Sequence, residues 1–405
     1  MTGPDPLVRA AVEAAYRDEW GQVVATLIGV TGDWDLAEDC TQDAFASALA
    51  TWPRDGVPGR PGAWLTTTAR NRALDRLRRD GVGAAKLRER AVLDRDPEQR
   101  AEPDEIPDDR LRLIFTCCHP ALPFPARVAL TLRTLAGLTT AEIARAFLAA
   151  EPAMAQRLVR AKRKIAEAGI PYRVPPAELL PGRLAAVLAV LYLIFNEGYG
   201  EEGGGRSLAT EAIRLNRVLI GLMPGEAEPR GLLALMLLHE ARRATRTRDG
   251  VLVTLEHQDR SAWDGELIAE GVAALDDALA IGMAGPYQVQ AAIAACHAQA
   301  PDAASTDWPQ IAALYIRLVE LAPSPVVELN RAVAVAMVDG LEAGLSLVDE
   351  LEGRLDGYHL LPATRADLLR RAGRDAEART AYQQALELAP SEAERRFLAG
   401  RLREL

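Results

Sequence analysis

The sequence has little of what marks β-rich proteins. Aromatic residues make up only 5% of its 405 residues, and β-branched residues alternating with polar ones are hard to find. Ala, Leu, Arg and Glu dominate instead, so the sequence predicts an all-α protein. Its hydrophobic content of 49% is enough to bury several cores, which indicates two to four domains.

Cysteine is also scarce. The four cysteines, Cys40, Cys117, Cys118 and Cys296, show no framework spacing, which favours a reducing cytoplasm over a disulfide-bonded fold. Cys117, Cys118 and His119 are adjacent, but neighbouring side chains on a helix diverge by about 100° and no second ligand pair follows at zinc spacing. We therefore expect no bound metal and no cofactor.

Enzyme motifs are incomplete in this chain. The glycines of 198–205 follow a helix pattern and close with Gly-Arg-Ser, where a phosphate-binding loop needs Gly-Lys-Ser or Gly-Lys-Thr. His239 and Glu240 lead to Arg243, where a zinc protease needs its second histidine. The five scattered histidines form no acid–base pair, so we expect the chain not to be an enzyme.

Long hydrophobic runs are missing as well. The longest uninterrupted apolar run, 184–195, is shorter than the roughly 20 residues of a membrane-spanning helix and is typical of a buried helix. No signal-peptide pattern precedes it. The sequence therefore predicts a cytoplasmic protein without a membrane segment.

The charge of the chain is unevenly distributed. The net charge of −10 argues against a general nucleic-acid binder. However, residues 1–173 carry 25 basic against 24 acidic side chains, whereas 174–405 carry 22 against 33. Two segments of the first half are basic: 60–90 has nine basic and three acidic residues, and 127–168 has eight and three. Such patches on an acidic protein indicate local nucleic-acid contacts.

Residues 138–165 have the pattern of two short helices separated by about one turn. Thr139 and Glu142 have capping-box spacing, and Pro152 suits the first turn of the second helix. The first helix is expected to bury Ile143, Phe147 and Leu148. The second is expected to bury a stripe of Met154, Leu158, Ala161 and Ile165 and to point outward Gln156, Arg157, Arg160, Arg163 and Lys164. This pattern predicts a helix-turn-helix, although a surface hairpin with a solvated charged face would give a similar one.

Two further helices are predicted before this motif, after a first helix at about 7–30. One, capped by Asp33 or Asp35, carries Ala37, Cys40, Ala44 and Ala48 on one face and Glu38, Asp39, Gln42 and Asp43 on the other. That acidic face is either solvated surface or a docking face for a protein. A Pro- and Gly-rich loop is predicted at 52–61. The segment 62–79 that follows has apolar residues four apart, which would form one face of a helix: Leu65, Ala69, Ala73 and Leu77. The other faces of this helix would carry Arg70, Asn71, Arg72, Arg76, Arg78 and Arg79. It is a second cationic helix.

Composition also divides the chain. The charged segment 81–107 predicts a flexible linker whose 26 steps could reach about 85 Å, and the four prolines of 171–181 mark a boundary. Near the end, 315–324 recurs as 382–391, an offset of 67, close to two 34-residue units. Gly373, Ala378, Tyr382, Ala385 and Pro390 have the positions of a tetratricopeptide unit, which predicts stacked helix-pair repeats.

Three motifs in a fixed order, 35–45, 63–79 and 138–145 with 154–162, resemble bacterial sigma factors of the extracytoplasmic-function type. The resemblance covers about residues 1–170, and the remainder resembles the subgroup with a long C-terminal helical extension. It implies five segments: a sigma-2 domain (1–80), a flexible linker (81–107), a sigma-4 helix-turn-helix domain (108–170), a Pro-rich boundary (171–181) and a tetratricopeptide-like extension (182–405).

The resemblance also implies partners: core RNA polymerase, through its β′ clamp and β flap, and promoter DNA. The β′ clamp would be bound by Asp35, Glu38, Asp39, Gln42, Asp43 and Phe45. The −10 element and nearby DNA would be held by Trp52, Arg54, Arg60, Arg70, Asn71, Arg76 and Arg79. The −35 element would be read by Gln156, Arg157, Arg160, Arg163 and Lys164. Trp64 is expected to be a core residue.

Two other interpretations remain at this stage. A helix-turn-helix regulator with a repeat-based sensor would explain 138–165 but not the acidic helix or the cationic helix 62–79. The second interpretation is an enzyme, but the sequence contains no recognisable set of catalytic groups. For the extension, its excess of 11 acidic charges beside basic DNA-binding helices predicts an intramolecular regulatory contact. The alternative is a repeat domain that recruits an unrelated protein in trans.

Overall fold

The computed structural model describes residues 6–79, 109–147, 149–199 and 208–405. This part of the chain is almost entirely helical, which confirms the all-α prediction. Its strands are the short antiparallel pair β1 (Thr247–Arg248) and β2 (Val251–Leu252), in which Thr247 lies opposite Leu252. The predicted linker 81–107 lies outside the described residues, as does Leu148. The chain divides into two compact units, residues 1–215 and 216–405.

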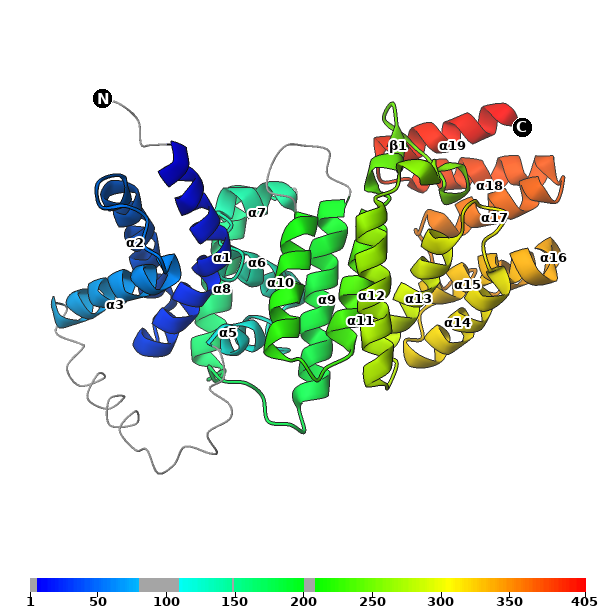
Figure 1. The fold of residues 1–405 in the computed structure, drawn as a ribbon. Coiled ribbons are helices and arrows are strands. Elements are labelled where there is room, and N and C mark those ends of the chain that lie inside the picture. The colour runs from blue at the N-terminus through cyan, green and yellow to red at the C-terminus, as the bar shows by residue number, and fades with distance from the viewer. Residues whose placement is uncertain (1–5, 80–108, 148, 200–207) are drawn as a thin grey trace. The chain divides into compact units, whose positions relative to one another are not determined.

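The first unit begins with three helices, α1 (Pro6–Thr31), α2 (Trp34–Asp55) and α3 (Pro61–Arg79) (Figure 1). Asp33 caps α2, as predicted, because its carboxylate accepts hydrogen bonds from the backbone N–H groups of Asp35 and Leu36. The predicted apolar face of α2 is buried, with Ala37, Cys40, Ala44 and Ala48 shielded from solvent. Each of these helices packs on the other two, so they form one small bundle.

The next four helices are α5 (Asp109–Cys117), α6 (Phe124–Thr134), α7 (Thr140–Ala146) and α8 (Glu151–Glu167). Thr139 and Glu142 form the predicted capping box of α7, and Pro152 lies in the first turn of α8. The predicted stripe of α8 is buried: Met154, Leu158, Ala161 and Ile165. It packs against α6 and α7, so α7 and α8 have the pairing that a helix-turn-helix requires.

Helix α9 (Leu180–Tyr199) contains the long apolar run. By length and composition alone its segment 180–198 could cross a membrane. Its apolar side chains, however, pack against α5 and α6. Arg183 in its first turn donates a hydrogen bond of 2.6 Å from Nη2 to the carbonyl oxygen of Phe115. Part of the apolar surface of α9 is thus buried between helices, although only 39% of the segment 180–198 is buried.

The first compact unit continues beyond the Pro-rich segment 171–181 into helix α10 (Leu208–Leu222). Arg214 of α10 donates a hydrogen bond to the carbonyl oxygen of Leu135, in addition to the bond from Arg183 to Phe115. The first part of the predicted extension thus shares a core with the helix-turn-helix. The predicted functional boundary at 182 stays a prediction.

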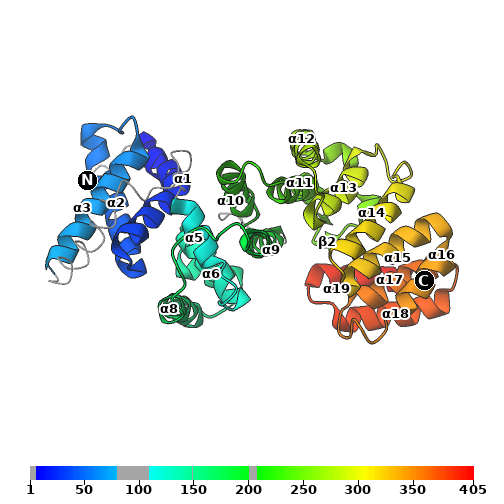
Figure 2. The ribbon, with the colours of Figure 1, turned by 90° about the horizontal axis from the view of Figure 1, so that it is seen from below.

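The second unit contains the helices that follow α10. They are α11 (Glu228–Glu240), α12 (Gly265–Ile281), α13 (Pro286–Gln299), α14 (Trp308–Leu321), α15 (Pro325–Asp339), α16 (Leu341–Asp349), α17 (Leu360–Arg371), α18 (Asp375–Leu388) and α19 (Glu392–Glu404). Short 3-10 turns lie at 243–245, 255–257 and 260–262. From α14 onward each helix packs on the next, as Figure 2 shows from below.

The glycine and alanine residues of this region lie at turns and at close contacts between helices. Gly373 has φ of +72° in the turn between α17 and α18, a conformation that glycine adopts without strain. Ala378, Tyr382 and Ala385 are buried on α18. Gly344 lies close to α15, since a Cβ atom there would meet the Cβ of Ala336 at 2.4 Å. Packing of each helix on its neighbours is the arrangement of stacked helix pairs.

Two histidines of the second unit are held neutral by their surroundings. Burial, reinforced by nearby Arg242, lowers the pKa of His239 to about 3. Burial, with Arg242 and Arg260 as further causes, lowers the pKa of His297 to about 4. The ring of His297 lies edge-on to Trp308, with 5.3 Å between ring centroids. Protonation of either ring would place a cation beside arginines in a poorly solvated site.

We predict that these histidines make the second unit acid-sensitive. A histidine of the unfolded chain binds protons below about pH 6.5, whereas the folded site does not until about pH 3 to 4. Stability is therefore full above pH 6.5 and falls as the pH drops, by about 1 kcal/mol for each histidine near pH 5.5. Thermal unfolding at pH 7.5 and 5.5 measures the loss. His297→Gln should reduce it, while the exposed control His257→Gln should not; an equal loss in all three proteins would contradict this assignment.

Candidate functional site

The acidic helix α2 and the cationic helix α3 are joined by ion pairs. Arg76 Nη2 lies 2.7 Å from Asp43 Oδ2, and Arg76 Nη1 lies 3.5 Å from Asp39 Oδ2. Arg72 Nη1 lies 3.4 Å from the same oxygen of Asp43. Arg76 is therefore directed toward α2. These carboxylates stay partly exposed, so the pairs contribute little stability, about 0 to 1 kcal/mol each.

The remaining polar side chains predicted for the −10 site differ in surroundings. Arg60, Arg70 and Asn71 are exposed. Arg79 is also exposed and donates a hydrogen bond from Nε to the carbonyl oxygen of Asp75. Arg54 is exposed as well, but its guanidinium pairs with the adjacent Asp55, with Nε 2.7 Å from Oδ1. The outer face of α3 thus presents cations that a phosphate backbone can contact.

Two aromatic residues predicted for binding lie in the core instead. Phe45 is 5% exposed, and its ring lies 5.0 Å from that of Tyr16 and 6.1 Å from that of Trp20. Trp52 is 2% exposed and meets the half-buried Trp64 at 5.6 Å, nearly edge to face. Aromatic side chains gain more from packing with each other than from exposure on a charged face. Phe45 therefore does not lie on a docking surface, nor Trp52 on a DNA-binding loop.

The outer face of α8 is accessible. Gln156, Arg160, Arg163 and Lys164 are exposed, and Arg157 is half-buried. Their local contacts are weak: Arg160 Nη2 lies 3.5 Å from Gln156 Oε1, and Arg163 Nε lies 3.3 Å from Glu167 Oε1. Side chains held this loosely can reorient toward base edges or phosphates.

Glu38 differs from its predicted position on a solvated face. It is 5% exposed, and its carboxylate is enclosed by two cations from the helix-turn-helix segment. Arg133 Nε lies 3.0 Å from Oε2, and Lys162 Nζ lies 2.7 Å from Oε1. Lys162 Nζ also lies 2.7 Å from Oδ1 of Asp35, whose side chain is exposed. A carboxylate removed from water requires such partners, which is why Glu38 faces inward.

Sequence reasoning did not identify Arg133 and Lys162, which hold Glu38. On α8 Lys162 lies at the flank of the buried stripe, away from the exposed face that contains Gln156 and Arg160. One signal was present: the chain contains only three lysines, Lys86, Lys162 and Lys164, among 47 basic residues. Lys164 is exposed on the same helix, however, so this rarity alone does not distinguish Lys162.

The adjacent cysteines have a packing role. Cys117 and Cys118 are buried and contact the hydroxyl groups of Thr134 and Thr131 at 3.2 and 3.6 Å. Burial raises the pKa of the Cys118 thiol to about 11 and that of Cys117 further, so both stay protonated. Within the described ranges no cluster of three or more metal-ligating side chains occurs.

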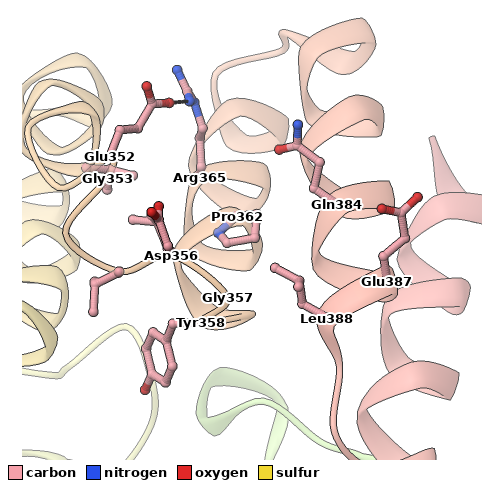
Figure 3. Close-up of a pocket in the computed structure, with 13 residues that line it drawn as sticks. Glu352, Gly353, Asp356, Gly357, Tyr358, Pro362, Arg365, Gln384, Glu387 and Leu388 are labelled. Atoms are coloured by element: carbon pink, nitrogen blue, oxygen red, sulfur yellow. Dashed lines mark hydrogen bonds and ion pairs between the residues drawn. The ribbon is translucent and has the colours of Figure 1, made fainter.

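The second unit has a hollow of about 470 Å³ between the loop that follows α16 and helices α17 and α18 (Figure 3). Arg365 on its wall pairs with Glu352 and lies 2.9 Å from Asp349. Glu387 and Leu388 of α18 line the opposite side. The lining is mixed, with the carboxylates of Glu352, Asp356 and Glu387 beside apolar Leu355, Leu361 and Leu388.

A helix-turn-helix with an exposed basic second helix, preceded by a bundle with a second basic helix beside an acidic one, is typical of a DNA-binding protein. Residues 15–82 match the family described as Sigma-70 region 2, and 112–165 match Sigma-70, region 4. Residues 183–279 match a family of unknown function, DUF6596. An uncharacterized protein of Rhizobium meliloti (strain 1021) is 44% identical over 394 residues, 95% of this chain and 93% of that protein. The chain belongs to the sigma-70 family, as an extracytoplasmic-function-like sigma factor with a C-terminal extension.

Proposed function

We propose that this protein directs core RNA polymerase to specific promoters by recognising both the −10 and −35 elements, and that its C-terminal extension regulates this activity. Sigma-70 regions 2 and 4 support the broader role of an alternative sigma factor, which is a transcription initiation factor and not an enzyme. The observation that carries the finer proposal is the pair of exposed basic faces on separate helices, α3 and α8. A cytoplasmic location follows from this role.

DNA recognition is divided between the two faces. On α8, Arg157 and Arg160 can read base edges, while Arg163 and Lys164, further along the helix, hold phosphates. On α3, Arg70 and Arg79 contact the DNA backbone near the −10 element. The loop 56–60, which contains the exposed Arg60, binds an unstacked base of that element. A regulator with a lone helix-turn-helix would need only α8, so the cationic face of α3 favours the sigma factor.

Polymerase docking involves the part of α2 that remains accessible. Asp39, Gln42 and Asp43 share one face of this helix, with Asp39 and Gln42 exposed and Asp43 half-buried. The negative charge of Asp39 and Asp43 suits a basic helical surface such as the β′ clamp. The β flap is the corresponding partner proposed for the helix-turn-helix segment.

The extension is proposed to regulate through the first compact unit. Helix α9 and the first part of α10 belong to that unit, in which Arg183 donates to the carbonyl oxygen of Phe115 on α5 and Arg214 to that of Leu135 just after α6. A change in the extension therefore has a direct route to α5 and α6. The acidic excess of 174–405 adds an electrostatic attraction to basic faces that salt would screen over about 8 to 10 Å. Recruitment of an unrelated protein by the repeats is the competing role.

We predict that the full chain confers promoter-specific initiation on core RNA polymerase in transcription in vitro. Asp39→Lys should weaken its affinity for core polymerase about tenfold or more, because it reverses a charge at the docking face. The fold should survive, since the Asp39–Arg76 pair at 3.5 Å is exposed. Asp18→Lys on the exposed side of α1 is the matched control. No initiation by the unaltered chain, with normal binding to DNA alone, would instead support an ordinary helix-turn-helix regulator.

We predict that Arg157→Ala or Arg160→Ala relaxes selectivity at particular bases of the −35 element. A bidentate arginine–guanine pair contributes about 1 to 3 kcal/mol of discrimination, so selectivity should fall roughly 5- to 150-fold at one base. Initiation rates on promoters randomised across that element measure the effect. Arg173→Ala, beyond the end of α8, serves as control. Unchanged base preference in both α8 variants would remove these residues from the recognition surface.

We predict that removal of the extension changes transcription from a cognate promoter by about tenfold or more, as a coupled regulatory domain should. The chain should end after Met223, which keeps α9 and α10, because a shorter chain would uncover the apolar surfaces of α5 and α6. Either a gain or a loss supports regulation and gives its sign. Equal activity of the two chains, in vitro and in cells, would argue against it.

A further inference from the structure

One strongly exposed residue on the outer face of α8 is apolar. Val159 is 64% exposed, and its neighbours on this face are the exposed polar residues Gln156, Arg160 and Arg163. At about 3.6 residues per turn, Gln156 and Arg163 point away from the buried stripe of α8, with Val159 on one side of them and Arg160 on the other. Val159 therefore belongs to the surface that this helix presents to solvent, and not to the core of the helix-turn-helix.

Exposure alone does not give Val159 a function, since single apolar side chains are common on protein surfaces. A comparison with Phe124, the other exposed large hydrophobic residue in the described part of 109–170, is informative. Phe124 is 37% exposed, and its ring lies beneath the guanidinium of Arg127, with 5.7 Å from Cζ to the ring centre. Val159 is far more exposed, and its neighbours on the helix face are polar.

Valine is also an unfavourable choice for an exposed helix position. It is a poorer helix former than alanine, because its branched side chain loses rotational freedom against the preceding turn. At two other exposed positions of α8, 153 and 166, the chain has alanine. The valine at 159 therefore gains little for the helix itself, and contact with a partner would give it a reason.

The side chain of Val159 is prepared for such a contact. A β-branched residue in a helix has one strongly preferred χ1 rotamer, so the two methyl groups of Val159 keep a fixed direction. A group that is already fixed loses little conformational freedom when it binds. Gln156 and Arg160 are different, because their weak mutual contact of 3.5 Å leaves them able to reorient.

The major groove of DNA offers one apolar group to a side chain of this kind. Base edges in that groove present hydrogen-bond donors and acceptors, and thymine adds its C5-methyl group. The valine side chain can neither donate nor accept a hydrogen bond, so it would leave the amino group of an adenine or a cytosine unpaired. Thymine is therefore the base that fits Val159.

The position of Val159 along α8 relates this thymine to the base that Arg160 contacts. Successive residues of a helix rise by about 1.5 Å, whereas successive base pairs are about 3.4 Å apart. A recognition helix lies in the major groove, so Val159 and Arg160 would face the same base pair or two adjacent ones.

We propose that Val159 is a base-reading residue that contacts the C5-methyl group of a thymine in the −35 element, at or next to the base pair that Arg160 contacts. The inference rests on the proposed recognition of DNA by α8. It adds an apolar residue to a recognition surface for which the sequence indicated only polar side chains, and it assigns thymine as the base that this residue selects.

Replacement of thymine by deoxyuridine tests this contact, because it removes the methyl group and leaves base pairing unchanged. Each thymine of the −35 element, on either strand of a cognate promoter, is replaced in turn, and initiation by core RNA polymerase with the full chain is measured at subsaturating concentration. We expect one replacement to lower initiation about fourfold. This factor corresponds to the burial of one methyl group, at about 0.8 kcal/mol.

Val159→Ala should abolish the difference between thymine and uracil at that position, because the shorter side chain no longer reaches the methyl group. The fold should survive, since Val159 is exposed and alanine is the better helix former. Val338→Ala, at an exposed valine of α15, is the matched control and should keep the fourfold difference. Circular dichroism reports the helical content of both variants.

The outcomes separate this contact from the sigma-factor function. If the chain initiates but no uracil replacement has an effect, or the effect persists in Val159→Ala, the thymine contact is overturned and the sigma-factor function stands. A −35 element without any A·T pair overturns the contact as well.

A chain that does not initiate from any promoter overturns the sigma-factor function. Duplexes that the full chain selects from random DNA then decide on Val159. A difference in affinity between thymine and uracil that Val159→Ala abolishes supports the contact. The absence of such a difference, or of any bound duplex, overturns it.

Discussion

Burial of one carboxylate organises the first half of this protein. A charged side chain taken out of water is strongly destabilising unless it is paired, and Glu38 is paired twice, with Arg133 and Lys162. Removal of either cation would leave a buried charge, at a cost of about 3 to 5 kcal/mol in comparable sites. Because the cations belong to α6 and α8 and the carboxylate to α2, this interaction joins the segment that matches Sigma-70 region 2 to the segment that matches region 4.

The basic side chains of the first unit fall into two groups, those paired with carboxylates and those exposed to solvent. Arg72 and Arg76 of α3 pair with carboxylates of α2, which orients the two helices, while Arg60 and Arg70 stay exposed. The outer face of α8 is likewise accessible, because Lys162 lies on its flank. Exposed basic residues are thus concentrated on two helix faces, although the net charge of the chain is −10.

The first helix of the C-terminal extension, α9, packs on helices of the first compact unit. This helix is apolar enough to resemble a membrane span, but its apolar side chains pack on α5 and α6. The bond from Arg183 to Phe115 anchors it there. The helices from α14 onward each pack on the next, and a hollow lies beside Arg365.

The sequence alone determined whatever depends on local periodicity and short-range hydrogen bonds. The capping box of Thr139 and Glu142, the cap at Asp33 and the buried stripe of α8 follow from spacings of three or four residues, and they are present as predicted. Periodicity could not tell that Phe45 and Trp52 belong to the core, because an aromatic residue at a helix position suits either a core or a binding face. Nor could it reveal that Glu38 turns inward. Its partner Arg133 lies 95 residues away in the chain, and only tertiary packing decides which distant cation meets a carboxylate.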